Sequence, residues 1–473
     1  MNRLNIPSVQ SPKWLIFIAV VKFLQYGFLY LELKKLGLEE IDGLFVTTGD
    51  TNSYFLNIQN FLEGKSSFNA CRMPGFFPIY ALPFVLFGKS LANNLTILLQ
   101  MFVSIYSVWI LGKLTFRITG NQLMSKLAIL IYSISIFVSL YDVHGLAESF
   151  SVGFLIFGLY LYYKFLDAEK PSLLFWSGFF FTWSFFFRQI AIVVYGLLGL
   201  FLILHLIRTR NSSKIIRTAL YFSVVFILAE SFWIGFNWSD KNRFIPFVKP
   251  IPECYPTNFP QQRFDLIKLP VAWGGLYSHW NGEAEWFLNP SMSKADFPFD
   301  NVFSSAYNLD SLDKLRQTYF ASLQMKEGED LKRVQENIRL KSNAYIESYR
   351  SENMFSYYFL NKVKLAGKFM FPKVAEKLPF PGRTEMNIVE LGLKAFYTVL
   401  LWFVSLCGLI MWFKVKWSYL PYMITSFSIV SFIVLLGWVE QRYYAPVYPM
   451  MVVSCAIIMG SMLNFLKARF SSE

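Results

Sequence analysis

Two residues in the loop after the first apolar segment have side chains that suit acid–base chemistry on a phosphorylated substrate. Asp50 stands in the run Gly49-Asp50-Thr51, and Arg72 precedes the turn Met73-Pro74-Gly75. A carboxylate can take a proton from a hydroxyl group, and a guanidinium can hold a phosphate. If both side chains face one cavity, they predict transfer of a group from a phosphorylated lipid to an alcohol.

Asp50 also has a simpler explanation as a helix cap. Phe55, Ile58 and Phe61 recur at helical intervals, so Asp50 begins a short amphipathic helix that ends at Gly64. Aspartate is a favoured residue at the start of a helix, where its oxygens accept from free N–H groups. Both interpretations stay open, because one carboxylate can start a helix and also act as a base.

The composition is that of a membrane protein. Hydrophobic residues make up 55% of the 473 residues and charged residues only 16%, which is too little charge for a soluble protein of this length. Apolar runs long enough to cross about 30 Å of hydrocarbon recur along the chain. We therefore expect an all-α polytopic protein with about ten transmembrane helices. The predicted spans are roughly 14–33, 93–112, 124–141, 147–165, 172–187, 189–207, 218–236, 391–413, 417–437 and 444–466.

The formal net charge of +13 would suit a nucleic-acid-binding protein, but its distribution indicates a membrane topology. If the N-terminus is cytoplasmic, every predicted cytoplasmic segment carries Lys or Arg, as the positive-inside rule requires. Ten spans then return the C-terminus to the cytoplasm. We expect a multi-pass protein of the plasma (inner) membrane, or of the ER membrane in a eukaryote. Membrane lipids are expected partners and nucleic acid is not.

This topology divides the chain into three parts. Residues 1–236 form an N-terminal membrane module whose first loop, 34–92, lies outside the cytoplasm. Residues 237–390 form an external region that is irregular and proline-rich at first and partly helical later, and 391–473 return to the membrane. Within the external region, the stretch 357–371 carries lysines at near-helical spacing. It predicts an amphipathic helix on the bilayer surface.

The predicted topology also collects polar candidates on the external side. They are Asp50, Arg72, Asp142, His144, Arg188 and Arg442. The four cysteines have no metal-binding spacing, so we expect no metal site. Cys71 and Cys254 both fall outside, where they would be able to pair in an oxidising compartment, and the sequence leaves this open.

Several short motifs, taken in order along the chain, resemble the GT-C glycosyltransferase superfamily. Four motifs carry the resemblance: Gly49-Asp50-Thr51 through Tyr54 to Arg72-x-Pro74-Gly75, then Leu146-Ala147-Glu148-Ser149, then Phe187-Arg188-Gln189, and finally Gln441-Arg442-Tyr443 with Pro446. The most similar branch contains the protein O-mannosyltransferases and the lipid A aminoarabinose transferases. The likeness does not cover 237–340.

Two positions depart from the pattern of these relatives. Many carry Asp-Glu at the first site, whereas Thr51 follows Asp50 here, so a paired carboxylate at that site is in doubt. The position before the proline turn is often Lys, whereas it is Arg72 here. Arginine keeps the charge and adds a bidentate fork.

The resemblance implies a GT-C-like fold and a reaction. Such enzymes transfer a hexose or pentose from a polyprenyl-phosphate donor to an acceptor hydroxyl outside the cytoplasm, usually with inversion, and this branch works without a metal or other cofactor. The acceptor, whether a protein, a lipid or a glycan, stays open. The resemblance implies Asp50 as general base and Glu148 as a second catalytic residue. It implies Arg72, Arg188 and Arg442 as donor-phosphate ligands, and Tyr54, Asp142, His144 and Tyr443 as further substrate contacts.

Several of these residues also have a simpler explanation. Glu148 would favour the N-terminus of a helix, and Arg188 would extend to the lipid headgroups. Asp142 and His144 would be ordinary polar residues at the membrane interface. Glu230 lies inside a predicted span, where we expect it to have a structural partner.

Two other functions fit a polytopic protein with external arginines. A transporter or flippase of lipid-linked saccharides predicts charges deep in the spans and repeat symmetry, and neither is evident in the sequence. A polysaccharide polymerase or ligase would not be expected to place Asp50 at the start of an amphipathic helix behind the first span. The sequence therefore favours the lipid-linked sugar transferase.

Overall fold

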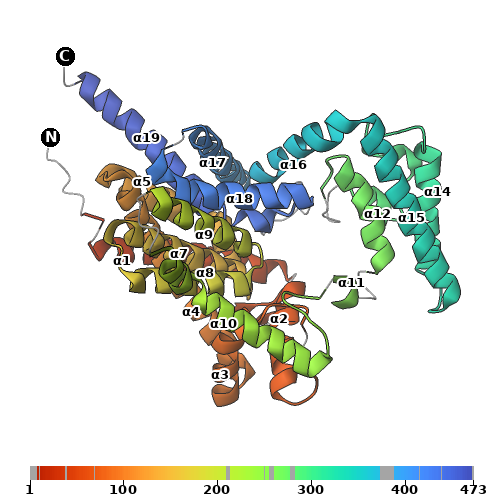
Figure 1. The fold of residues 1–473 in the computed structure, drawn as a ribbon, viewed down its shortest axis with the longest axis horizontal. Helices are drawn as coiled ribbons and strands as arrows, with labels where there is room; N and C mark the ends of the chain where they lie inside the picture. The colour runs from red at the N-terminus through yellow and green to blue at the C-terminus, as the bar shows by residue number, and fades with distance from the viewer. Residues whose placement is uncertain are drawn as a thin grey trace. The chain divides into compact units, whose positions relative to one another are not determined.

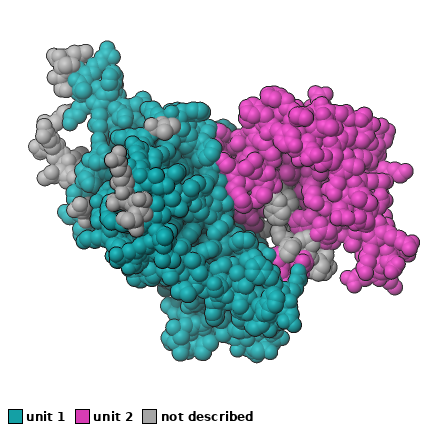
Figure 2. All heavy atoms as spheres, in the orientation of Figure 1, with its two compact units in different colours: residues 1–248, 372–429, 445–473 teal, residues 249–371, 430–444 magenta. Residues whose placement is uncertain are grey.

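The computed structural model describes residues 8–9, 11–37, 40–68, 70–208, 214–249, 251–254, 260–276, 283–372, 388–414, 416–437 and 439–470. Nearly all of its secondary structure is helical (Figure 1), which confirms the predicted all-α class. Within this part of the chain, a single two-stranded antiparallel sheet pairs β1 (Ile41–Asp42) with β2 (Phe45–Val46). Figure 2 shows the division into unit 1 (residues 1–248, 372–429 and 445–473) and unit 2 (residues 249–371 and 430–444).

Eight helical segments of the described chain are long and apolar enough to cross a membrane. They are α1 (Lys13–Leu36), α4 (Lys89–Thr119), α7 (Glu148–Ala168), α9 (Ala191–Arg208), α10 (Ile215–Lys241), α17 (Ile388–Trp412), α18 (Leu420–Leu436) with the 3-10 turn before it, and α19 (Tyr448–Phe470). A ninth span results if α5 (Gln122–Ile134) and α6 (Ile136–Asp142), which meet at 53°, cross as one. The tenth predicted span corresponds to α8 (Pro171–Phe187), which has 17 residues. The chain is thus a multi-pass membrane protein, and ten is an approximate count of its spans.

Glycines allow the membrane helices of unit 1 to approach one another closely. A Cβ atom at Gly178 of α8 would lie 2.0 Å from the carbonyl oxygen of Phe222 in α10. A Cβ atom at Gly153 of α7 would lie 2.4 Å from Cγ1 of Val103 in α4. Small residues serve this purpose in membranes because water exclusion cannot drive helix association there. Helices α4, α7, α8 and α10 consequently pack against one another in that order.

Unit 2 has a hydrophobic core of its own. Helices α12 (Gln261–Ala272), α14 (Leu309–Ser322) and α15 (Glu329–Glu352) surround a buried cluster that includes Trp273, Trp286 and Tyr307. The guanidinium of Arg316 in α14 is buried and donates to the carbonyl oxygens of Asn289 and Met292, both at 2.7 Å. Unit 2 consists of residues 249–371 and 430–444, whereas the sequence led us to expect one consecutive external region, 237–390.

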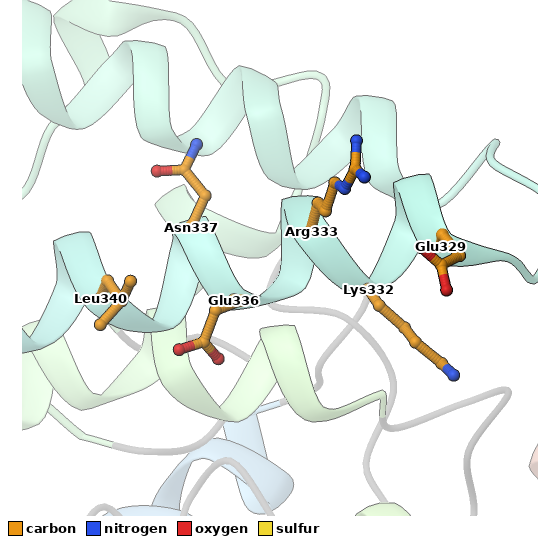
Figure 3. Close-up of a pocket in the computed structure, with 6 residues that line it drawn as sticks. All are labelled: Glu329, Lys332, Arg333, Glu336, Asn337 and Leu340. Carbon is orange, nitrogen blue, oxygen red and sulfur yellow. The ribbon is translucent and has the colours of Figure 1, made fainter.

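The outer face of α15 is charged. Six of its residues line an open hollow of about 470 Å³ (Figure 3). They are Glu329, Lys332, Arg333, Glu336, Asn337 and Leu340. Alternating charge of this kind is typical of a helix face in water.

The amphipathic helix expected at 357–371 is present as the π-helical turn η4 (Ser356–Leu360) followed by α16 (Asn361–Met370). One face is buried in unit 2 through Leu365 and Phe369, while Phe359 and Val363 on the other face are exposed. Lys362 Nζ donates to the carbonyl oxygens of residues 434 and 435, both at 3.3 Å, at the end of the membrane helix α18. The exposed apolar face therefore begins beside the end of a predicted span.

We predict that this apolar face lies in the lipid interface, because an amphipathic helix at the end of a span buries its apolar side in the headgroup region. Phe359 and Leu340 provide a matched pair, since both side chains are 56% exposed and both belong to unit 2. Spin labels on Phe359→Cys and Leu340→Cys can be measured in the full chain in bilayers. The label at 359 should be more accessible to oxygen than to a water-soluble nickel complex, and the label at 340 should show the reverse. Equal accessibilities at the two positions would contradict the prediction.

Candidate functional site

Helix α2 (Gly49–Leu62) carries Asp50, but Asp50 does not cap it. Thr48 is the cap, because its Oγ1 accepts from the backbone N–H of Thr51 at 3.3 Å. The Thr51 hydroxyl accepts from the backbone N–H of Thr48 at 2.9 Å, which completes a reciprocal capping box. The interpretation of Asp50 as the cap is therefore wrong. Its carboxylate lies in the first turn, where the helix dipole favours a negative charge.

Asp50 and Arg72 form an ion pair, so the two side chains that the sequence only placed in one loop do meet. Arg72 Nη2 lies 2.6 Å from Asp50 Oδ1, and Arg72 Nε donates to Ser53 Oγ at 2.8 Å. The guanidinium also lies over the ring of Tyr54, 4.7 Å from its centroid. The Asp50 side chain is 34% exposed and that of Arg72 is 20% exposed, so a substrate can reach the pair from solvent.

An aromatic junction of Tyr54, Phe76, Phe150 and Phe187 joins the first loop to the ends of two membrane helices. The ring centroid of Phe76 lies 5.2 Å from that of Tyr54, 5.7 Å from Phe150 and 5.0 Å from Phe187. Phe150 and Phe187 stack on each other at 4.9 Å. Each ring lies within a few residues of a predicted site residue in the sequence. Packing of these rings thus brings three of the four motifs to one place in unit 1.

Gly75 permits the closest contact at this junction. The 3-10 turn η1 (Pro74–Phe76) lies directly on the end of α8, and a Cβ atom at Gly75 would be 2.6 Å from the carbonyl oxygen of Phe186. The same atom would be 2.9 Å from the backbone nitrogen of Phe187. Because these are backbone atoms, they cannot rotate away as the end of a side chain can.

Glu148 and Arg188 form a second ion pair, which is buried. Glu148 is the first residue of α7, and Arg188 immediately follows the last residue of α8. Their side chains are 1% and 8% exposed. The pair therefore links α7 to α8, and Glu148 does more than favour a helix N-terminus.

Asp142 belongs to a third ion pair, with a residue that we did not single out in the sequence. Lys22 Nζ of α1 lies 3.3 Å from Asp142 Oδ2 and 2.7 Å from Ser139 Oγ, and both charged side chains are buried. Ser104 of α4 donates to the same carboxylate oxygen at 2.7 Å. The sequence did contain an indication of this pair, because Lys22 lies inside the first predicted span. An ionisable side chain within a span has a high free-energy cost unless it has a partner.

The loop that carries His144 is attached to the first loop through its backbone. His144 forms a parallel bridge with Val46 of β2, and Gln100 Nε2 donates to its carbonyl oxygen at 2.8 Å. Although the residue keeps some exposed surface, protein surrounds its imidazole ring, and this burial lowers the pKa of His144 to about 4. The ring is consequently neutral near pH 7.

The other residues considered in the sequence belong to unit 2, to α10 or to the part of the chain outside the described residues. Arg442 and Tyr443 belong to unit 2, where Arg442 Nε lies 2.5 Å from Glu440 Oε2. Glu230 in α10 is buried, and no described residue hydrogen-bonds to either of its carboxylate oxygens, so the structural partner we expected is not found there. His279, whose aromatic neighbours in the sequence suit sugar stacking but which is also explained as a solvated loop histidine, lies outside the described residues.

A search of the described residues finds no group of three or more His, Cys, Asp or Glu side chains that could hold a metal ion. Metal independence stays a prediction.

No protein-family model and no curated protein matches the chain. A comparison with solved structures finds distant similarities, two of which are to AglB and ArnT. The archaeal oligosaccharyltransferase AglB from Archaeoglobus fulgidus, in complex with an inhibitory peptide and a dolichol-phosphate, is 12% identical with a TM-score of 0.47. The match covers 97% of this chain and 52% of AglB, so this chain spans about half the length of AglB. ArnT from Cupriavidus metallidurans, bound to undecaprenyl phosphate, is 10% identical with a TM-score of 0.37, over 94% of this chain and 77% of that one. Likeness this distant assigns no function.

We predict that Gly75→Ala destabilises the protein. The added methyl group overlaps backbone atoms of Phe186, so α8 and the first loop must move apart, at a cost of about 1–3 kcal/mol. Gly27→Ala is the matched control, because a Cβ atom there meets nothing within 4 Å. Thermal unfolding in lipid should show a lower midpoint for Gly75→Ala alone. Equal midpoints for the two variants would show that the contact is not tight.

We also predict that His144 makes stability depend on pH. Its pKa falls from an ordinary value of 6.5 to about 4 in the folded state. Between these values the folded protein binds fewer protons at this residue than the unfolded chain, so the free energy of unfolding decreases as the pH falls through this window. The stability difference between wild type and His144→Gln should change from pH 6.5 to 4 and stay constant above pH 7. A difference that is constant throughout would exclude this role.

Proposed function

We propose that the chain is a membrane glycosyltransferase that moves a hexose or pentose from a polyprenyl-phosphate donor to an acceptor hydroxyl outside the cytoplasm. The observation that carries the proposal is the accessible Asp50–Arg72 pair, held on a loop that packs against the ends of α7 and α8. A base and a phosphate ligand side by side at the end of membrane helices suit a substrate whose phosphate is attached to a lipid. The order of GT-C-like motifs along the chain supports the same reaction.

In the proposed mechanism, the donor phosphate competes with Asp50 for Arg72. An arginine has five N–H donors in a rigid fork, so it can hold a phosphate bidentately. When Arg72 binds the phosphate, it no longer pairs with Asp50, and the Asp50 carboxylate can then act as general base. The acceptor oxygen attacks the anomeric carbon, its proton passes to Asp50, and the bond from that carbon to the phosphate oxygen breaks. Polyprenyl phosphate leaves with the bonding electrons, and the sugar is inverted.

A single carboxylate is sufficient for this reaction. Glycosidases use two carboxyl groups because the leaving sugar oxygen must be protonated. A phosphate is a good leaving group without a proton, and a cation beside it stabilises the developing charge. The absence of a second acid at Thr51 is consistent with this chemistry.

The other predicted residues have supporting roles in this proposal. Tyr54 is a positioning residue, because its ring lies under the guanidinium of Arg72. Glu148 orients Arg188, which becomes a second phosphate ligand when their buried pair opens. Asp142 anchors the end of α6 to α1 through Lys22, and His144 holds the loop between α6 and α7 against the first loop. Arg442 and Tyr443 remain candidate residues for binding the donor. The proposed reaction requires no metal or other cofactor.

A flippase of lipid-linked saccharides is the second candidate. That function predicts charges within the membrane spans, and Lys22 and Glu230 lie in the candidate spans α1 and α10. A flippase would move the lipid without forming a new glycosidic bond, so an assay of sugar transfer separates the two functions.

Replacement of Asp50 tests the proposed base. Asp50→Asn should lower transfer of radiolabelled sugar at least 100-fold, the scale of a general base, because the amide cannot take the proton. Glu63→Gln is the control, since it removes a carboxylate from the end of the same helix and should leave transfer unchanged. Full activity of Asp50→Asn would end the base hypothesis.

Binding of undecaprenyl phosphate separates the role of Arg72 from that of Asp50. Arg72→Ala should weaken binding at least tenfold, which corresponds to the loss of one charge-assisted contact of about 1.4 kcal/mol or more. Asp50→Asn should bind as tightly as wild type or more tightly, because the competing carboxylate is gone. Weaker binding by Asp50→Asn would contradict the proposed competition.

A further inference from the structure

Helix α2 also lines a pocket on the face turned away from Arg72. A pocket of about 480 Å³ lies between this helix, the β1–β2 hairpin and the start of α4. Its polar lining includes Glu40, Asp42, Asn52, Gln59, Lys89 and Asn93. We propose that this pocket binds a neutral oligosaccharide. Its further role as the site for a glycan acceptor rests on the proposed function.

The geometry of a helix separates this pocket from the Asp50–Arg72 pair. Asn52, Phe55 and Gln59 of the lining are spaced by three and four residues, so they share one face of α2. Asp50 and Ser53, which hold Arg72, lie on the opposite face. The pocket is therefore a site distinct from the proposed catalytic pair, on the same rigid element.

The polar wall of the pocket is preorganised by a chain of hydrogen bonds. Gln59 Nε2 donates to the Tyr80 hydroxyl at 2.6 Å, and this hydroxyl donates to Asn93 Oδ1 at 3.0 Å. Asn93 Nδ2 donates to Asp42 Oδ2 at 2.9 Å, and Ser90 Oγ lies 3.0 Å from Asp42 Oδ1. Gln59, Tyr80 and Asn93 are buried. Each amide is thus held in one orientation, which lowers the entropy cost of binding a polar ligand.

The chemistry of the lining favours a neutral, hydroxyl-rich ligand. Carboxylates and carboxamides accept and donate hydrogen bonds to hydroxyl groups, and Phe45 and Phe55 provide apolar surface for the C–H faces of a sugar ring. The lining carries two carboxylates, Glu40 and Asp42, and one ammonium group, Lys89. Their net negative charge disfavours an anionic ligand, so we do not expect a phosphate to bind in this pocket. Its volume is within the range of about 300–1,000 Å³ that is usual for ligand pockets.

The distance across the helix determines the length of an acceptor. A helix with its side chains is about 10–12 Å in diameter, so a monosaccharide in the pocket cannot also reach Asp50. An acceptor glycan that used both faces would need several sugar units. We infer that longer neutral glycans are better acceptors than single sugars.

The experiment measures binding of neutral trisaccharides of glucose, mannose and galactose by saturation-transfer NMR, with the full chain in nanodiscs. At least one should bind, and Asp42→Asn or Asn52→Ala should weaken its binding at least fivefold. Asn52 is exposed, so its replacement should leave the fold intact if Asp42→Asn unfolds the protein. Glu63→Gln is the control for the loss of a carboxylate from the same loop.

Asp50→Asn distinguishes this proposal from the proposed function. That variant should lose sugar transfer but keep trisaccharide binding. The pocket proposal is wrong if no trisaccharide binds, if Asp42→Asn and Asn52→Ala both bind as wild type does, or if a sialylated trisaccharide or inorganic phosphate binds equally well. If a trisaccharide binds but the wild-type protein transfers no sugar, the proposed oligosaccharide site stands and the proposed glycosyltransferase function is wrong.

Discussion

The close contact between the turn at Gly75-Phe76 and the end of α8 is the constraint on which the candidate site depends. Asp50 and Arg72 lie on a loop, and a loop alone cannot hold the proposed base and the proposed phosphate ligand in a fixed relation to a membrane-bound substrate. The aromatic junction provides that relation, because Phe76 packs at once against a ring of the loop and rings of α7 and α8. Edge-to-face ring contacts have preferred geometries, so they orient the loop as well as attach it.

Three ion pairs of unit 1 differ in exposure, and the difference distinguishes pairs that stabilise the fold from the pair that a substrate can reach. Lys22–Asp142 and Glu148–Arg188 are buried, and each joins elements that are distant in the sequence. Breaking a buried pair leaves an uncompensated charge, so both pairs oppose any change in how these helices pack. The Asp50–Arg72 pair is partly exposed and lies within a single loop. It can therefore exchange partners with a substrate without disturbing the membrane helices.

Helix α2 contributes to two places, the Asp50–Arg72 pair and the pocket behind it. The capping box of Thr48 and Thr51 satisfies the backbone N–H groups of both residues, so Asp50 is not the cap. One face then presents the carboxylate to Arg72, while the other presents amides to a polar pocket whose wall is built from residues of the hairpin and α4. Both sites share one rigid support, which would allow donor and acceptor to be positioned relative to each other.

The sequence by itself determined the all-helical membrane class, the approximate positions of the spans, the amphipathic character of α2 and of α16, and the presence of Asp50 and Arg72 in one loop. These features depend on hydropathy, on helical periodicity and on residues in one loop, which are all local properties. The tertiary structure decided that Thr48 caps α2, that Asp142 pairs with Lys22, that Glu148 pairs with Arg188, and that a polar pocket lies behind α2. A single sequence shows none of these, because each depends on which side chains meet when segments that are far apart pack together. Contacts between distant segments follow from the shapes of the packed surfaces, and hydropathy and periodicity do not describe shape.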